Sequence, residues 1–278
     1  MHRSGFAAPL QRQQTAAGSE KAVKPMLSKL RKNLKWLDPF TYVDLFVMPR
    51  LNPKDNEYLG WAIYIFFAFV FALAFYTLLG LALNTNSPLM IVVSASMEPV
   101  LYRGDVVLLQ GVPPQSLNAP LVELDAQTLR NTALIDFAQI GYELGDDGVL
   151  RSKILDFGNG KKTEITTNGD IVVYFSELRN EPIIHRAVAK LHAKDGYYII
   201  TKGDNYTKNT TVDQDCGKVF SGMPSKPCIN LYPQPAEKLD GRMILKIPFL
   251  GCAKLWLMDD LATLLTQGKL PANFGGVC

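Results

Sequence analysis

The stretch YLGWAIYIFFAFVFALAFYTLLGLAL, from Tyr58 to Leu83, contains no charged side chain. It is longer than the roughly 20 residues that an α-helix needs to cross the ~30 Å hydrocarbon core of a bilayer. A buried core helix rarely stays apolar on every face over this length, and a cleaved signal peptide has a shorter apolar region at the start of the chain. The sequence therefore predicts one transmembrane helix over residues 58–83.

Basic residues lie mostly on one side of this apolar stretch. Ten lysines and arginines precede it, from Arg3 to Lys54, and the first one after it is Arg103. The positive-inside rule therefore places residues 1–57 in the cytoplasm and residues 84–278 on the far side of the membrane.

The N-terminal segment has two parts of different composition. Residues 1–25 are rich in Gln, Ala, Ser and Gly, which is typical of a disordered tail. Residues 27–47 mix basic and apolar side chains, which suits either a helix on an anionic membrane face or an ordinary solvated helix. No motif assigns a role to either part.

Charge and cysteine content narrow the class of protein further. The formal net charge is only +3, which argues against a nucleic-acid partner. Neither a C-x-x-C pair nor a histidine cluster is present, so we expect no metal and no other cofactor. The four cysteines all follow the apolar stretch, in the compartment where disulfides persist, and the sequence does not rank their three possible pairings: they are Cys216, Cys228, Cys252 and Cys278.

After Asn84 the pattern changes to short runs rich in Val, Ile, Tyr and Phe between turn residues, which is typical of strands. These runs cover residues 89–95, 105–110, 170–176, 182–192 and 197–202. Weaker signals over 112–165 indicate an insertion of mixed structure. We therefore predict a mainly β fold, in which a single N-terminal transmembrane helix precedes an extracytoplasmic β-rich domain over 84–278.

Close to the C-terminus, the stretch IPFLGCAKLWLMDDLATLL (247–265) is apolar with a helical rhythm. Lys254, Asp259 and Asp260 interrupt it, and these charges make a second membrane span costly. We expect an amphipathic helix that packs on the domain or lies at the membrane interface.

Candidate catalytic side chains occur in the β-rich part of the chain. A serine is a poor nucleophile until a base takes its proton and a third group orients that base. The histidines are His2, in the predicted cytoplasmic segment, and His185 and His192. The last two are seven residues apart, so an extended strand puts them on opposite faces and only one can face a given serine.

Four stretches together resemble the conserved boxes of type I signal peptidases. SASMEPVLYRGD resembles the motif S-x-S-M-x-P-x-L-x-x-G-D, and NGDIVVYF resembles the strand motif G-D-h-V-h-F, where h is apolar. IIHRAVAK and TKGDN resemble the two boxes that follow. The resemblance covers most of residues 85–250, although the first box alone also resembles one in LexA-like self-cleaving repressors. The four stretches are residues 94–105, 168–175, 183–190 and 201–205.

The residue before Arg186 distinguishes the branches of that family. Bacterial members typically have a lysine there as general base, whereas archaeal and endoplasmic reticulum members have a histidine; this chain has His185. The resemblance thus implies the Ser-His branch, with Ser96 as nucleophile and His185 as base. It also implies that the backbone N–H of Ser96, helped by the Ser94 hydroxyl, stabilises the oxyanion.

An aspartate completes the site in the Ser-His branch, about six residues after the aspartate of Gly-Asp-Asn. The spacing is longer here. We favour Asp213 as the orienting acid, with Asp204 in a supporting or structural role and Asp215 as the alternative.

The resemblance implies a membrane-bound serine endopeptidase that removes signal peptides from exported preproteins after small residues. Its partners would be preprotein signal peptides, the bilayer, and accessory signal peptidase or translocon subunits. The catalytic domain would face the lumen of the endoplasmic reticulum or the exterior of a prokaryotic cell. Two alternatives are a membrane-tethered protease with narrow clients or self-cleavage, and a non-catalytic subunit of an export complex.

Overall fold

The computed structural model describes Trp36, residues 38–220 and 223–269, and Cys278. The chain forms two compact units, residues 1–76 and 77–278. Much of the predicted cytoplasmic segment, including the tail over 1–25, lies outside the described residues.

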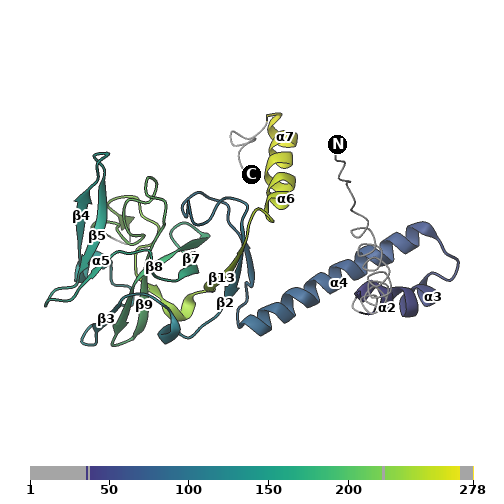
Figure 1. Ribbon diagram of the computed structural model, residues 1–278, viewed down its shortest axis with the longest axis horizontal. Coiled ribbons are helices and arrows are strands. Elements are labelled where there is room, and N and C mark those ends of the chain that lie inside the picture. The colour runs from purple at the N-terminus through teal and green to yellow at the C-terminus, as the bar shows by residue number, and fades with distance from the viewer. Residues whose placement is uncertain (1–35, 37, 221–222, 270–277) are drawn as a thin grey trace, which may run out of the picture. The chain divides into compact units, whose positions relative to one another are not determined.

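The longest helix of the described residues is α4, Glu57–Leu83, which begins one residue before the predicted span (Figure 1). Its most apolar window has a mean hydropathy of 2.4, and only 6% of that window is buried. Within the described residues it is the one helix long and apolar enough to cross a membrane. This helix and the β-rich domain after it confirm the predicted fold class.

A short helical run precedes α4 in the first unit. Asp38 caps its N-terminus, because its carboxylate accepts a hydrogen bond of 3.0 Å from the backbone N–H of Phe40. The Phe40 ring contacts the Phe71 ring of α4, with 5.6 Å between centroids. The run therefore packs against α4 rather than extending away from it. It consists of α2 (Pro39–Tyr42), η1 (Val43–Val47) and α3 (Met48–Leu51).

An eight-stranded sheet forms the main body of the second unit, with the order β1-β2-β13-β7-β8-β9-β12 and with β3 added beside β8 (Figure 1). The β3–β8 pair is parallel and the other pairs are antiparallel. The strands are β1 (Leu89–Ile91), β2 (Val106–Gln110), β3 (Leu121–Leu124), β7 (Ile171–Ser176), β8 (Glu181–Ala193), β9 (Gly196–Lys202), β12 (Gln234–Pro235) and β13 (Gly241–Ile247).

The middle strands of this sheet are covered on both faces. In β7, the four consecutive residues Ile171–Tyr174 are all buried. A strand buried on both faces has a continuous apolar run rather than an alternating one, which explains the sequence IVVY over these four residues. Strand β8 lies between β7 and β9, so its side chains have neighbours on both sides.

Smaller elements surround the sheet. A three-stranded sheet is formed by β4 (Gln139–Leu144), β5 (Leu150–Asp156) and β6 (Lys162–Glu164), and β10 (Val219–Phe220) pairs with β11 (Met223–Pro224). Short helical turns are η2 (Pro114–Ser116), α5 (Leu134–Phe137) and η3 (Ala236–Lys238). The segment 112–165 thus has mixed structure, and its β3 belongs to the large sheet.

The C-terminal helix begins later than the predicted range of 247–265. Ile247 still pairs with Val106 of β2, so β13 must end before a helix can start. The helical segment follows β13 and is formed by α6 (Cys252–Leu255), η4 (Trp256–Asp260) and α7 (Leu261–Gln267) (Figure 1). Disulfides join Cys252 to Cys278 and Cys216 to Cys228.

Candidate active site

Ser96 lies in the loop between β1 and β2. Met97 and Leu101 of the same loop are completely buried and pack in the core beside Val107 of β2. These apolar anchors leave Ser96 half-buried and Ser94 exposed, with 3.1 Å between their hydroxyl oxygens. The loop therefore presents two serine hydroxyls at the surface of the sheet.

His185 projects from β8 and is almost completely buried. Its Nδ1 lies 2.7 Å from Oδ2 of Asp213, which is buried in the loop after β9. Burial pushes the pKa of Asp213 up, but the charge of His185 and the hydrogen bonds around the carboxylate outweigh that effect and hold the pKa below its ordinary value. An ionised Asp213 accepts a hydrogen bond from the Nδ1–H group of His185, which leaves Nε2 as the basic nitrogen of that ring.

The segment over residues 201–215 carries Asp213 and also contacts the loop that carries Ser96. The backbone N–H of Asn205 donates to the carbonyl of Ser96 at 2.9 Å, and the Asn205 amide donates to the carbonyl of Ala95 at 2.7 Å. A Cβ on Gly203 would lie 2.7 Å from the Ser96 carbonyl oxygen, so glycine is needed for this close approach. The segment that carries Asp213 therefore also holds the backbone of Ser96.

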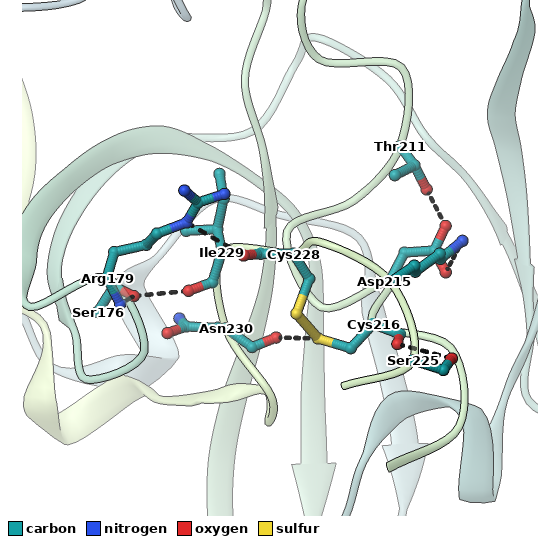
Figure 2. Close-up of a disulfide and its surroundings, with 10 residues drawn as sticks. Ser176, Arg179, Thr211, Asp215, Cys216, Ser225, Cys228, Ile229 and Asn230 are labelled. Atoms are coloured by element: carbon teal, nitrogen blue, oxygen red, sulfur yellow. Dashed lines mark hydrogen bonds and ion pairs between the residues drawn. A yellow bond between two sulfur atoms is a disulfide. The ribbon is translucent and has the colours of Figure 1, made fainter. Parts of the chain in front are cut away.

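The Cys216–Cys228 disulfide fixes the far end of that segment. The backbone N–H groups of Ile229 and Asn230, which follow Cys228, donate to the carbonyl of Asp213 at 3.0 and 3.1 Å. Figure 2 shows Ile229 and Asn230 beside the disulfide. The cross-link thus joins two chain segments that meet at the Asp213 backbone.

The other two candidate acids bind different partners. Asp204 forms a buried ion pair with Arg186, with 2.5 Å between Oδ2 and Nη2. Asp215 accepts hydrogen bonds from Thr211 and Tyr142 and pairs with Lys226 at 2.7 Å (Figure 2, Thr211 and Asp215). Of the three aspartates, the structure brings Asp213 to His185.

Within the described residues, Ser96 and His185 form no hydrogen bond with each other, and the Ser96 hydroxyl oxygen lies 3.1 Å from that of Ser94. Catalytic hydrogen bonds are often long in a free enzyme and tighten when substrate binds.

His192, the other histidine of β8, lies in a separate exposed cluster. Its Nδ1 is 2.6 Å from Oε2 of Glu123, and its ring stacks on Tyr197. Glu123, Asp125 and His192 are grouped closely enough to hold a metal ion, with ligand atoms within 4.8 Å of one another. The register of β8 against β9 shifts between Ala187 and Ala189, so the strict alternation assumed from the sequence does not hold. The two histidines are separated by their distance along β8 and not by opposite faces of the strand. Seven residues at ~3.3 Å per residue span about 23 Å.

Three residues of the site are not predicted from the sequence. Tyr174 and Thr201 donate to the carboxylate of Asp213, and Gln214 bonds to Thr201. Tyr174 lies in the strand motif over residues 168–175, which marks it only as an apolar position. A tyrosine within a continuous apolar run indicates a buried hydroxyl, and a buried tyrosine hydroxyl usually needs a hydrogen-bond partner. That feature of the sequence could have identified Tyr174 as a residue of the site.

Three relatives resemble this chain over part of its length. The signal peptidase complex catalytic subunit SEC11 of Scheffersomyces stipitis is 28% identical over 140 residues, which are 50% of this chain and 54% of that protein. The protein of that name in Clavispora lusitaniae is 27% identical over the same shares. The one in Saccharomyces cerevisiae is 27% identical over 196 residues, which are 69% of this chain and 80% of that protein.

The chain spans about half the length of the first two of these relatives. No family model matches it. The relatives agree with the family that the four sequence motifs indicated, so the predicted resemblance is confirmed: the chain is a homologue of the catalytic subunits of signal peptidase complexes.

Proposed function

We propose that this chain is a membrane-bound serine endopeptidase that removes signal peptides from exported preproteins and cuts after small residues. The buried His185–Asp213 pair carries the proposal. It is supported by Asn205, which hydrogen-bonds the Ser96 backbone from the same segment that holds Asp213. This arrangement links a nucleophile, a base and an orienting acid through one loop.

In the proposed reaction, Oγ of Ser96 attacks the scissile carbonyl carbon while its proton passes to Nε2 of His185. The Asp213 carboxylate stabilises the imidazolium. The carbon–nitrogen bond breaks as His185 gives the proton to the leaving amine, and an ester on Ser96 remains. Water then attacks this ester and gives a proton to His185, and Ser96 recovers that proton when the ester bond breaks.

Two hydrogen-bond donors suit the oxyanion. They are the backbone N–H of Ser96 and the hydroxyl of Ser94, whose oxygen is 3.1 Å from the Ser96 hydroxyl oxygen. Asp204 has a structural role in this proposal, because its ion pair with Arg186 stabilises the Gly203–Asn205 turn from the strand that carries His185.

The substrate is proposed to bind in an extended conformation. Strand β1, which leads into the Ser96 loop, lies at one end of the strand order, so its outer edge can add a further strand. With residues 1–57 in the cytoplasm, the span formed by α4 keeps the domain over 84–278 near the bilayer, where signal peptides are still embedded.

The relatives support a proposal for partners and location. Their names describe subunits of a signal peptidase complex, so we propose that this chain also works with accessory subunits. Eukaryotic relatives favour the lumen of the endoplasmic reticulum over the exterior of a prokaryotic cell.

Cleavage of a preprotein with an Ala-x-Ala site by the purified full-length chain tests the proposal. Ser96→Ala should abolish cleavage, and Ser94→Ala should lower the rate by about 10²–10³, as for loss of one oxyanion donor. Ser116→Ala, at an exposed serine of η2, is the control and should keep the full rate. Wild-type activity in Ser96→Ala, or no labelling of Ser96 by a serine-directed probe, would refute the proposal.

A further inference from the structure

The carboxylate of Asp213 is bonded on one side only. Its Oδ2 accepts from Thr201 Oγ1 at 2.6 Å and from Tyr174 OH at 2.8 Å, and it lies 2.7 Å from Nδ1 of His185. Its Oδ1 is buried and has no hydrogen-bond partner within the described residues. A carboxylate that merely needed its polar atoms satisfied would have donors at both oxygens. Here three donors converge on the oxygen that faces the histidine.

Two of these donors, the hydroxyl groups, come from the two strands that flank β8, which carries His185. Tyr174 belongs to β7 and Thr201 to β9, and β8 lies between them. Both side chains are completely buried. The site therefore has a rigid frame, since strands position side chains more precisely than loops do.

Gln214 determines the direction of the Thr201 hydrogen bond. Its Oε1 accepts from the backbone N–H of Thr201 at 3.2 Å, which leaves its Nε2 as a donor to Thr201 Oγ1 at 3.3 Å. Because Thr201 Oγ1 receives this bond, its own proton is available for Asp213, the nearest acceptor.

We propose that Tyr174 and Thr201 are positioning residues, which turn the Asp213 carboxylate toward His185 and disperse its negative charge. This inference rests on the proposed function for its catalytic meaning. Neither hydroxyl touches the substrate in this scheme; both act through Asp213.

Loss of either hydroxyl should have two effects. The carboxylate becomes freer to rotate, so fewer imidazole rings are held in the reactive orientation and kcat falls. The carboxylate also keeps more negative charge on Oδ2 and holds the imidazolium more tightly, so His185 loses its proton at a higher pH. The acidic limb of kcat/KM should therefore move to higher pH.

Each of the three neighbouring strands contributes one titratable group that interacts with Asp213. They are Tyr174 from β7, His185 from β8, and Lys202 from β9, whose charge interacts with Asp213 and whose pKa is lowered by burial. Lys202 is unchanged in all the variants below. A shift of the acidic limb among them thus reports the hydroxyl that was removed.

The experiment compares full-length wild type with Tyr174→Phe, Thr201→Val and Thr201→Ser. We measure kcat and KM for an Ala-x-Ala preprotein against pH, the ¹³C NMR titration of the His185 ring, and the melting temperature. Tyr174→Phe and Thr201→Val should lower kcat about tenfold with KM nearly unchanged, as for one hydrogen bond to a charged group. Thr201→Ser keeps the hydroxyl and should behave as wild type.

Tyr198→Phe is the matched control. Tyr198 is also a buried tyrosine, and its hydroxyl donates to an aspartate, Asp195, at 2.8 Å. This variant should lose stability as Tyr174→Phe does but keep the wild-type acidic limb and His185 titration.

An unchanged His185 titration and acidic limb in folded Tyr174→Phe or Thr201→Val would overturn the inference, even if the melting temperature fell. If Tyr174→Phe does not fold, Thr201→Val decides alone. A wild-type chain that cleaves no preprotein would refute the proposed function instead, and the NMR titration would still test the contact between the hydroxyls and the His185–Asp213 pair.

Discussion

Both histidines of strand β8 lie beside a carboxylate, and the two histidine–carboxylate pairs differ in their surroundings. His185 is 2.7 Å from Asp213, and the two side chains are 2% and 1% exposed. His192 is 2.6 Å from Glu123, and those side chains are 37% and 46% exposed. Distance alone does not distinguish the pairs. Burial and the additional donors on Asp213 do.

We call the buried His185–Asp213 pair the inner pair and the exposed His192–Glu123 pair the outer pair. The difference in burial matters because water screens the charges of the outer pair. An exposed ion pair contributes about 0–1 kcal/mol to stability, since solvent competes with it and the side chains lose freedom. A buried carboxylate that loses its partners is much more costly. Burial therefore favours one geometry and one histidine tautomer in the inner pair, as a general base needs. The exposed outer pair is not constrained in this way.

The largest effect that separates the pairs should come from the acids. Asp213→Asn keeps the shape of the side chain but favours the wrong tautomer of His185, so kcat should fall by about 10⁴. Glu123→Gln should leave kcat within about twofold. Single-turnover cleavage measures both variants, and equal losses would mean that burial does not distinguish the two pairs.

The disulfide near the inner pair should affect stability and rate together. Replacing Cys216 and Cys228 by serine should cost about 3 kcal/mol of unfolding free energy and lower kcat, because the Asp213 backbone loses a constraint. Replacing Cys252 and Cys278 is the control, with a similar loss of stability but no loss of kcat. Urea unfolding and cleavage rates check this, and an equal fall in kcat for both pairs would contradict it.

Acid should weaken the inner pair through Asp213. Because the folded state lowers the pKa of this carboxylate below its usual 3.8, its contribution to stability is complete above that pH and is lost as pH falls through the lower folded value. The melting temperature of wild type should therefore fall more steeply below about pH 4 than that of Asp213→Asn. Parallel slopes for the two proteins would show that Asp213 is not stabilised in its ionised form.

The smallest effect should come from the outer pair. Glu123→Gln should change the unfolding free energy by less than about 1 kcal/mol, and raised salt should reduce that difference. Thermal unfolding at low and high salt measures it. A larger, salt-independent loss would mean that the exposed cluster has a structural role.

The sequence predicted the fold class well because the relevant signals are local. The type of secondary structure is indicated by consecutive residues both in the apolar stretch ending at Leu83 and in the β-rich runs after Asn84. The start of the C-terminal helix was placed too early, because the pairing of Ile247 with Val106 is a contact between distant residues. The shift in β8 beside Val188 depends likewise on its partner strand.

The site was predictable only in part. The resemblance of the four motifs to those of signal peptidases singled out Ser96 and His185, whereas the contacts of Tyr174, Thr201 and Gln214 are not encoded in any motif. The four cysteines could not be paired from sequence, since pairing depends on which loops meet in the fold.

We propose that His185, and not His192, serves as the base for Ser96. The most direct measurement is kcat/KM for an Ala-x-Ala preprotein with full-length His185→Ala and His192→Ala, purified in parallel with wild type. We predict that His185→Ala loses at least about 10⁴ in kcat/KM while His192→Ala stays within about twofold of wild type. Retained cleavage in His185→Ala, or an equal loss in both variants, would contradict the account.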